Sequence, residues 1–268
     1  MLARISAEEI SNALKETGYI ILHDIIDQSV LKEIREFWLM TYEEMPTQLD
    51  NQVIWGPFMG EANKIGYSND ANQNLFRSFD FLWNQPAHLL TRDLCIELQK
   101  IKNTATEKDS YYGLQFSPDR FGMYVTTSYY PPNAGRLSVH RDANKGSNQL
   151  VHFIVPLTFK GTDYLEGGLF LIDSKNKRID VDSLMKPGSV LFYDGGLPHG
   201  VDKIIPLPGK SIGRLQTFGI TTHFEAPWKS SDILDRISLK SLVRSRVSTI
   251  RDRFKRVLGF ENSFFARE

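Results

Sequence analysis

The sequence lacks the features that mark several large classes of protein. Only one of its 268 residues is cysteine, Cys95, so no internal disulfide can form. Lys and Arg together number 32, as do Asp and Glu, and this balance gives no argument for a nucleic-acid partner. No stretch approaches the roughly 18 apolar residues of a membrane span, and MLARISAEEI has no apolar run of signal-peptide length. These absences predict a soluble, cytoplasmic protein in a reducing compartment.

The chain does contain enough hydrophobic residues, 41%, to form one sizeable core, and we expect residues 1–268 to be a single domain. Residues 1–110 are expected to be a helix-rich N-terminal support that also supplies pocket segments. Ser6 with Glu9 is typical of a helix start, and YIILHDII (19–26) is typical of a strand. The aromatic-rich stretch 43–83 is expected to be irregular, with its rings mainly anchoring the core. A helix is expected from Pro86, followed by an exposed loop over 103–110.

Residues 111–224 have a different pattern, with short apolar segments separated by turn residues. Gly and Pro pairs such as Gly167-Gly168 and Pro187-Gly188 punctuate this region. Many short strands at such spacing predict a mainly β protein with flanking α-helices, whose core is a barrel or jelly roll. The strand candidates are FGMYVTTSYY, QLVHFIVPLTF, GGLFLI, SVLFY and RLQTFGITTHF.

The C-terminal segment 229–259 predicts a basic amphipathic helix. Between Ser231 and Leu258 there are eight Lys or Arg against three Asp. Such a helix can pack on the barrel with a solvated basic face, pair with a second subunit or a carrier protein, or lie on an anionic membrane. We favour packing on the barrel, followed by a homodimer or carrier contact. The apolar stripe consists of Leu239, Val243, Val247, Ile250, Phe254 and Leu258.

The residues that carry the most chemical information are His140 and Asp142, with His199 57 residues after Asp142. Alternate residues of a strand point to the same side, so His140 and Asp142 can face one ion if Arg141 points away. His199 follows another strand and a turn, so it can reach the same barrel mouth. Two imidazoles and one carboxylate leave half of an octahedral site open, which suits non-haem Fe(II). His-x-Asp alone occurs by chance, and the specificity comes from the order of strands and turns between the two histidines.

Arg214 lies in a predicted strand 15 residues after His199. A guanidinium keeps its charge and binds a carboxylate through two parallel hydrogen bonds. A dicarboxylate co-substrate would need such a group, although Arg214 could also be a surface residue.

These motifs resemble those of the Fe(II)/2-oxoglutarate-dependent dioxygenases, over about residues 111–224. The opening GYIILHDIIDQSVLKEIREFW is similar to the first strand and helix of the phytanoyl-CoA-hydroxylase-like branch, and SYYPPNAG to a stretch of isopenicillin-synthase-like members. The resemblance implies a double-stranded β-helix (jelly roll, cupin-like) with Fe(II) on His140, Asp142 and His199. It implies 2-oxoglutarate and O2 as co-substrates, with succinate and CO2 as products.

The resemblance also assigns residues to the co-substrate. Arg214 matches the arginine that binds the far carboxylate of 2-oxoglutarate, and Tyr130 matches a tyrosine that bonds the same carboxylate. The family often has Ser or Thr two residues after the arginine, where this chain has Gln216. Ser128 and Gln149 are further candidates for the missing polar contact. His152 is expected to be a core histidine rather than a site residue.

The residues do not identify the substrate. Segments 43–83, 111–120 and 162–166 mix aromatic and polar residues, which suits a medium-sized metabolite such as an amino acid, a sugar-like intermediate or a secondary metabolite. The family resemblance implies that the carboxylate of Asp142 favours hydroxylation, desaturation or ring closure over halogenation.

Three other hypotheses stay open. The chain could be a cupin-like metal protein or isomerase without oxidative chemistry, although a cupin has no reason to keep a buried arginine facing the metal. It could be a degenerate binding module, which the intact triad disfavours. It could oxidise a protein side chain or a nucleic acid, which the neutral net charge disfavours in the second case.

Overall fold

The computed structural model describes residues 2–44, 63–69, 74–84, 86–115, 121–142 and 150–223. All of them belong to one compact unit, Met1–Phe224. The predicted helix over 229–259 and the candidate Gln149 lie outside the described residues. Within the described part of the chain, no helix has the length and apolar character needed to cross a membrane.

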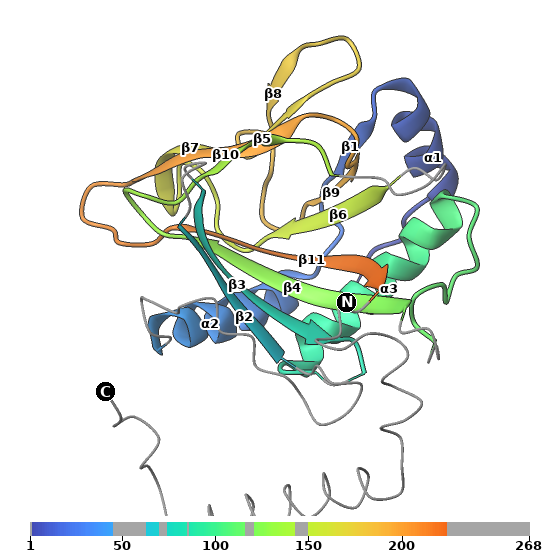
Figure 1. Ribbon diagram of the computed structural model, residues 1–268, viewed down its shortest axis with the longest axis horizontal. Helices are drawn as coiled ribbons and strands as arrows, with labels where there is room; N and C mark the ends of the chain where they lie inside the picture. The colour runs from blue at the N-terminus through green and yellow to red at the C-terminus, as the bar shows by residue number, and fades with distance from the viewer. Residues whose placement is uncertain are drawn as a thin grey trace, which may run out of the picture. The chain divides into compact units, whose positions relative to one another are not determined.

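Two antiparallel sheets form the framework (Figure 1). The large sheet has the strand order β1-β9-β6-β11-β4-β3-β2, and the small sheet has the order β5-β10-β7-β8. The large-sheet strands are β1 (Tyr19–Leu22), β2 (Asn63–Asn69), β3 (Leu75–Leu82), β4 (Phe121–Tyr130), β6 (Val151–Pro156), β9 (Val190–Asp194) and β11 (Arg214–His223). The small-sheet strands are β5 (Leu137–His140), β7 (Tyr164–Ile172), β8 (Arg178–Asp180) and β10 (His199–Pro206).

The eight strands from β4 to β11 form a jelly roll. Apart from the step from β7 to β8, which pair within the small sheet, successive strands alternate between the sheets: β4, β6, β9 and β11 lie in the large sheet, and β5, β7, β8 and β10 lie in the small one. Each time the chain passes from one sheet to the other, it places two successive strands on opposite sides of an inner core. The predicted mainly β fold with a double-stranded β-helix core is confirmed.

Three helices cover the outer face of the large sheet. These are α1 (Ala7–Glu16), α2 (Gln28–Glu44) and α3 (Leu89–Ala105). The start predicted for α1 is confirmed, since the Ser6 hydroxyl accepts the backbone N–H of Glu9 at 3.2 Å. Buried Trp38 of α2 and Leu98 of α3 join the same core as Phe153 of β6. Figure 1 shows α2 and α3 on one side of this sheet and the small sheet on the other.

A second core fills the space between the two sheets. It combines Tyr130, Ile154 and Leu191 of the large sheet with Leu169 and Val201 of the small sheet. Side chains of a strand alternate between its two faces. Residues an even number of positions from one of these five along the same strand therefore face the interior of the jelly roll. The site described below uses that inner face.

The region 43–83 is more regular than the sequence pattern indicated. Strands β2 and β3 form a hairpin there, and β3 extends the large sheet by pairing with β4 from Arg77↔Tyr129 to Leu82↔Tyr124. Arg77 lies among the apolar residues of one face of β3 and Asp80 among those of the other, so neither face is continuously apolar, which hid the strand. Phe79, Phe81 and Trp83 pack in the core between the large sheet and the helices, here called the helix-covered core. For these three residues, the expectation that the aromatic side chains anchor the core is confirmed.

The boundaries of one helix also differ from expectation. Helix α3 begins at Leu89 and runs to Ala105, into the predicted loop 103–110. Buried Asn103 holds the following turn by donating to the carbonyls of Ser110 and Tyr112, both at 2.9 Å.

Candidate metal centre and the buried arginine

The two histidines of the triad face each other across the small sheet. His140 is the last residue of β5 and His199 the first of β10, and the two are paired in the strand register. Asp142 follows β5, and its backbone N–H donates to the carbonyl of Gly195 at 2.9 Å, which ties it to the end of β9. As expected, Arg141 points away, because its guanidinium donates to the carbonyl of Gly196.

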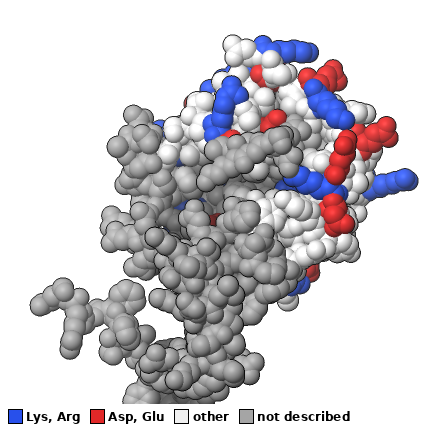
Figure 2. Space-filling model, turned by 45° about the vertical axis from the view of Figure 1, so that its right-hand side comes forward, with Lys and Arg blue, Asp and Glu red and all other residues white. Residues whose placement is uncertain are grey.

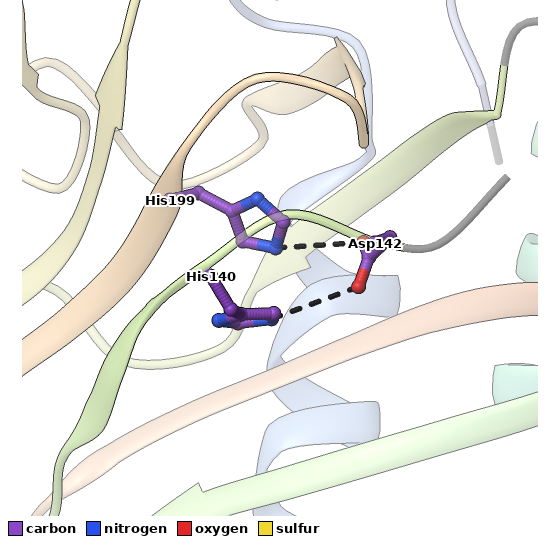
Figure 3. Close-up of side chains that lie close together, drawn as sticks. All are labelled: His140, Asp142 and His199. Carbon is purple, nitrogen blue, oxygen red and sulfur yellow. Dashed lines mark ion pairs between the residues drawn. The ribbon is translucent and has the colours of Figure 1, made fainter.

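The three side chains converge on one point (Figure 3). Their candidate ligand atoms all lie within 4.8 Å of one another. His199 Nε2 is 3.4 Å from Asp142 Oδ2, and His140 Nε2 is 3.6 Å from Asp142 Oδ1. Ligand atoms at right angles on an ion, each about 2.1 Å away, lie about 3 Å apart. The three residues therefore fit a metal ion after a small inward adjustment, and their role as ligands stays a prediction.

Both imidazoles are oriented by their own backbone. His140 Nδ1 lies 2.9 Å from the carbonyl of Ser138, and His199 Nδ1 lies 2.9 Å from the carbonyl of Leu197. A carbonyl oxygen can only accept, so each Nδ1 carries the hydrogen and each Nε2 presents its lone pair to the centre. This is the arrangement in which outer partners hold metal-binding imidazoles.

The charges of the centre also suit a cation. Burial lowers the pKa of His199, which favours the neutral imidazole that a metal requires. Burial acts to raise the pKa of Asp142, but contact with His152 and the charges of the two triad imidazoles outweigh it and lower that pKa. The carboxylate is therefore available in its ionised form.

His152 of β6 lies against this carboxylate instead of in a purely apolar core. Its Nε2 is 2.9 Å from Asp142 Oδ2, although it has no aligned hydrogen-bond partner. Gly195 leaves room for the pair, since a Cβ there would lie 2.8 Å from His152 Nε2 and 3.0 Å from Asp142 Oδ2. Tyr193 packs between the imidazoles, with ring centroids 5.2 Å from His199 and 5.4 Å from His152.

Arg214 is fully inside the protein, not on the surface. It begins β11, is 1% exposed, and pairs in register with Tyr130 of β4. Its Nε and Nη2 donate to the two oxygens of Asp182 at 2.5 and 3.0 Å, and its Nη1 donates to Gln216 Oε1 at 2.6 Å. Gln216, at the position where the family often has Ser or Thr, is thus a direct partner of the arginine.

The other residues that were predicted to bind the co-substrate differ in how closely they approach Arg214. The Tyr130 ring centroid is 5.6 Å from Arg214 Cζ, and burial raises the pKa of Tyr130 to about 12, so its hydroxyl stays protonated. Ser128 is buried and pairs in register with Gln216. Gln149 lies outside the described residues, so its role in the site stays a prediction.

Sequence reasoning did not single out Asp182, Tyr164 or Tyr193. Tyr193 could have been found by strand parity, because it pairs with His152 across β6 and β9 and shares its inner face. Asp182 follows β8 in a segment without periodicity, and nothing in the sequence marks it as the partner of Arg214.

Comparisons with known proteins support the fold. No protein-family model and no curated protein sequence matches the chain. Among solved structures, a prolyl-4-hydroxylase from Pseudomonas putida matches with a TM-score of 0.53 and 13% identity, covering 82% of this chain and 100% of its own. The non-haem α-ketoglutarate-dependent carbocyclase SnoK from nogalamycin biosynthesis matches with a TM-score of 0.54 and 13% identity, covering 88% and 94%. EctD from S. alaskensis, solved with 2-oxoglutarate and 5-hydroxyectoine, matches with a TM-score of 0.50 and 17% identity, covering 80% and 74%. The chain shares the fold of these oxygenases.

Proposed function

We propose that this chain, which has the fold of the Fe(II)/2-oxoglutarate-dependent oxygenases, is itself such an oxygenase and acts on a small-molecule metabolite. The observation that carries the proposal is the convergence of His140, Asp142 and His199 with both Nε2 atoms directed at the carboxylate. Two neutral imidazoles and one carboxylate on one side of an ion are the donor set of non-haem Fe(II) oxygenases.

The protein's part in the reaction is to hold and orient. His140, Asp142 and His199 would bind Fe(II), which with 2-oxoglutarate supplies the oxidation of an unactivated carbon by O2. The backbone carbonyls of Ser138 and Leu197 keep the two imidazoles in the required tautomer. The ring of Tyr193 packs against His199, and His152 lies against the carboxylate of Asp142.

Arg214 can still bind the far carboxylate of the co-substrate. A guanidinium has five N–H donors, and three of those of Arg214 are used by Asp182 and Gln216. One N–H of Nη1 and one N–H of Nη2 are left over, and we propose that these two donors bind the co-substrate carboxylate. Tyr130, beside the same group, is a candidate for an additional hydrogen bond.

The donor set narrows the reaction to a few types but does not select one of them. Because Asp142 is present, no ligand position is vacated for a halide, so hydroxylation, desaturation or ring closure is favoured. Basic and acidic side chains are interspersed on the described surface seen in Figure 2, which gives no support for a nucleic-acid substrate. A homodimer or carrier-protein contact through 229–259 is part of the proposal, and that segment lies outside the described residues.

One observation favours a second candidate, a cupin-like metal protein without oxidative chemistry. The pairing of Arg214 with Asp182 gives the buried guanidinium a structural reason to exist without any co-substrate. The two candidates differ in one measurable property, which is whether metal-loaded protein chelates a 2-oxo acid.

The test is a titration of the Fe(II)-loaded protein with 2-oxoglutarate under anaerobic conditions, followed by visible absorption. Chelation of the keto acid to iron is expected to produce a weak metal-to-ligand charge-transfer band. His199→Ala should abolish the band by removing a ligand, while His23→Ala, whose imidazole lies 2.9 Å from Ser189 Oγ outside the triad, should keep it. Bound metal without a band would support the cupin-like candidate, and no bound metal would refute both.

A further inference from the structure

The pair formed by Arg214 and Asp182 is among the most deeply buried features of the jelly roll. Their side chains are 2% and 4% exposed, and the contact is bidentate, with N···O distances of 2.5 and 3.0 Å. The buried guanidinium of Arg214 is thus already matched by a carboxylate from the same chain. Among the described residues, no other cation forms an ion pair with Asp182.

Asp182 is held in place without help from Arg214. Its Oδ2 accepts the hydroxyl of Tyr164 at 2.5 Å and the backbone N–H of Leu169 at 2.9 Å. The chain also leaves space for it at Gly168, where a Cβ would lie 2.2 Å from Oδ2. Two hydrogen bonds besides those from Arg214 therefore hold the carboxylate, and Gly168 leaves room for it, which argues that Asp182 does not move aside when a ligand enters.

The charges then decide what the site can recognise. Arg214 and Asp182 together are neutral, whereas a lone buried arginine would carry one positive charge that only a ligand carboxylate could neutralise. Bringing a second carboxylate to a neutral buried pair leaves a net negative charge, and a buried uncompensated charge is costly. A neutral group with oxygen acceptors could take the same two free N–H donors without that cost.

We infer that Asp182 makes the far end of the co-substrate site select by hydrogen bonding and not by charge. The site is then expected to accept 2-oxo acids with a neutral, oxygen-bearing far end about as well as 2-oxoglutarate. This inference rests on the proposed function, because it concerns the keto acid that binds to the iron.

The first experiment uses the wild-type chain loaded with Fe(II) under anaerobic conditions. It compares the affinity for 2-oxoglutarate with that for 4-nitro-2-oxobutanoate, in which a neutral nitro group replaces the far carboxylate. The charge-transfer band reports both ligands, because it depends on the keto acid end that they share. We expect the two dissociation constants to agree within about tenfold. A larger preference for 2-oxoglutarate would overturn the inference, since an uncompensated buried arginine should discriminate by roughly 100-fold or more.

The second experiment changes the compensating charge. Asp182→Asn keeps the size of the side chain and an acceptor for Leu169, but it leaves Arg214 positive. The preference for 2-oxoglutarate over the nitro analogue should then rise at least tenfold. The matched control is Asp180→Asn, two residues away, whose carboxylate pairs at the surface with Lys160 at 2.6 Å and should not affect the preference. An unchanged or lower preference in Asp182→Asn would contradict the inference.

These outcomes separate the inference from the proposed function. If neither keto acid produces the band in the wild-type chain, the proposed function fails and the inference fails with it. If both bind but 2-oxoglutarate is strongly preferred, the function stands and only the inference is overturned. Should Asp182→Asn not fold, the wild-type comparison alone decides.

Discussion

At the scale of single residues, the local environment determines what each polar side chain can do. His140 and His199 are prepared for a metal because carbonyls two residues earlier in the chain fix their Nδ1 hydrogens. Arg214 is prepared for a carboxylate but already has one, since Asp182 is its bidentate partner. In the sequence, the candidate metal ligands and Arg214 both look available for a ligand. In the structure, Arg214 already has a charged partner, whereas the Nε2 atoms of the two histidines point toward the candidate metal position.

The buried pair gives a prediction for stability. Arg214→Met should lower the free energy of unfolding by about 3–5 kcal/mol, because it leaves Asp182 as an unpaired buried charge. Adding Asp182→Asn should recover most of the loss, since the asparagine is neutral and still accepts from Leu169. Urea denaturation of the two variants at neutral pH measures this difference. If the double variant were no more stable than Arg214→Met, the loss would come from packing and not from charge.

At the scale of elements, glycines set how closely strands and loops approach the site. Gly168 in β7 has φ +104, and a Cβ there would lie 2.2 Å from Asp182 Oδ2. Gly161 has φ +80, and a Cβ there would have nothing within 4 Å. Gly168→Ala and Gly161→Ala therefore share the backbone strain of a positive φ. Only the first also displaces Asp182.

The matched pair of glycine variants tests this contact. Gly161→Ala should cost about 1–2 kcal/mol of unfolding free energy from backbone strain alone. Gly168→Ala should cost at least about 2 kcal/mol more, because the added methyl group must displace the buried Asp182 carboxylate. Equal costs in thermal or urea unfolding would show that the approach of β7 to Asp182 is not tight.

Helix α3 brings an unusual group into the helix-covered core. Lys102 is buried, with its ammonium 5.7 Å from the centre of the Phe153 ring. Burial, followed by the charge of Lys108, lowers the pKa of Lys102 to about 7. The folded protein therefore loses this proton near pH 7, while the unfolded chain keeps it until about pH 10.4.

This difference predicts how stability depends on pH. Between about pH 7 and pH 10 the unfolded chain binds the extra proton, so the free energy of unfolding should rise with pH by up to about 1.4 kcal/mol per unit. Lys102→Met should remove that rise and stabilise the protein most at neutral pH and below. The comparison is urea denaturation at several pH values, with the exposed Lys15→Met of α1 as a control that keeps the wild-type slope. A slope unchanged in Lys102→Met would mean that Lys102 stays charged in the fold.

In the whole molecule, the candidate metal centre joins parts of the chain that are far apart in sequence. His140 ends β5, His199 begins β10, and the backbone of Asp142 is bonded to Gly195 after β9. An ion bound there links these strand ends in the folded state only, so it should stabilise the domain by mass action.

We therefore expect Fe(II), added anaerobically at about 100 times its dissociation constant, to stabilise the fold by about 2.7 kcal/mol. For a domain of this size that corresponds to a rise in Tm of roughly 5–10 °C. A chelator should reverse the rise, and His199→Ala should not show it. A Tm that does not respond to Fe(II) in the wild-type chain would argue against the metal centre.

Sequence patterns alone were enough to predict the fold class and to single out His140, Asp142 and His199, which the structure brings together. Short strands with turn residues between them predict a jelly roll because alternation and turn chemistry are local properties of the chain. The strand β3 was missed because Arg77 lies among the apolar residues of one face and Asp80 among those of the other, so neither face shows a continuous apolar pattern.

The charged partner of Arg214 could be found only in the tertiary structure. The sequence placed Arg214 correctly on a strand after His199, but its partner Asp182 comes from a non-periodic segment after β8 that reaches the arginine through the closure of the two sheets. The position of His152 against Asp142 has the same origin, since β6 lies next to β9 in the large sheet. Local pattern predicts which residues face inward, whereas the partner of a buried charge depends on which strands the whole chain brings together.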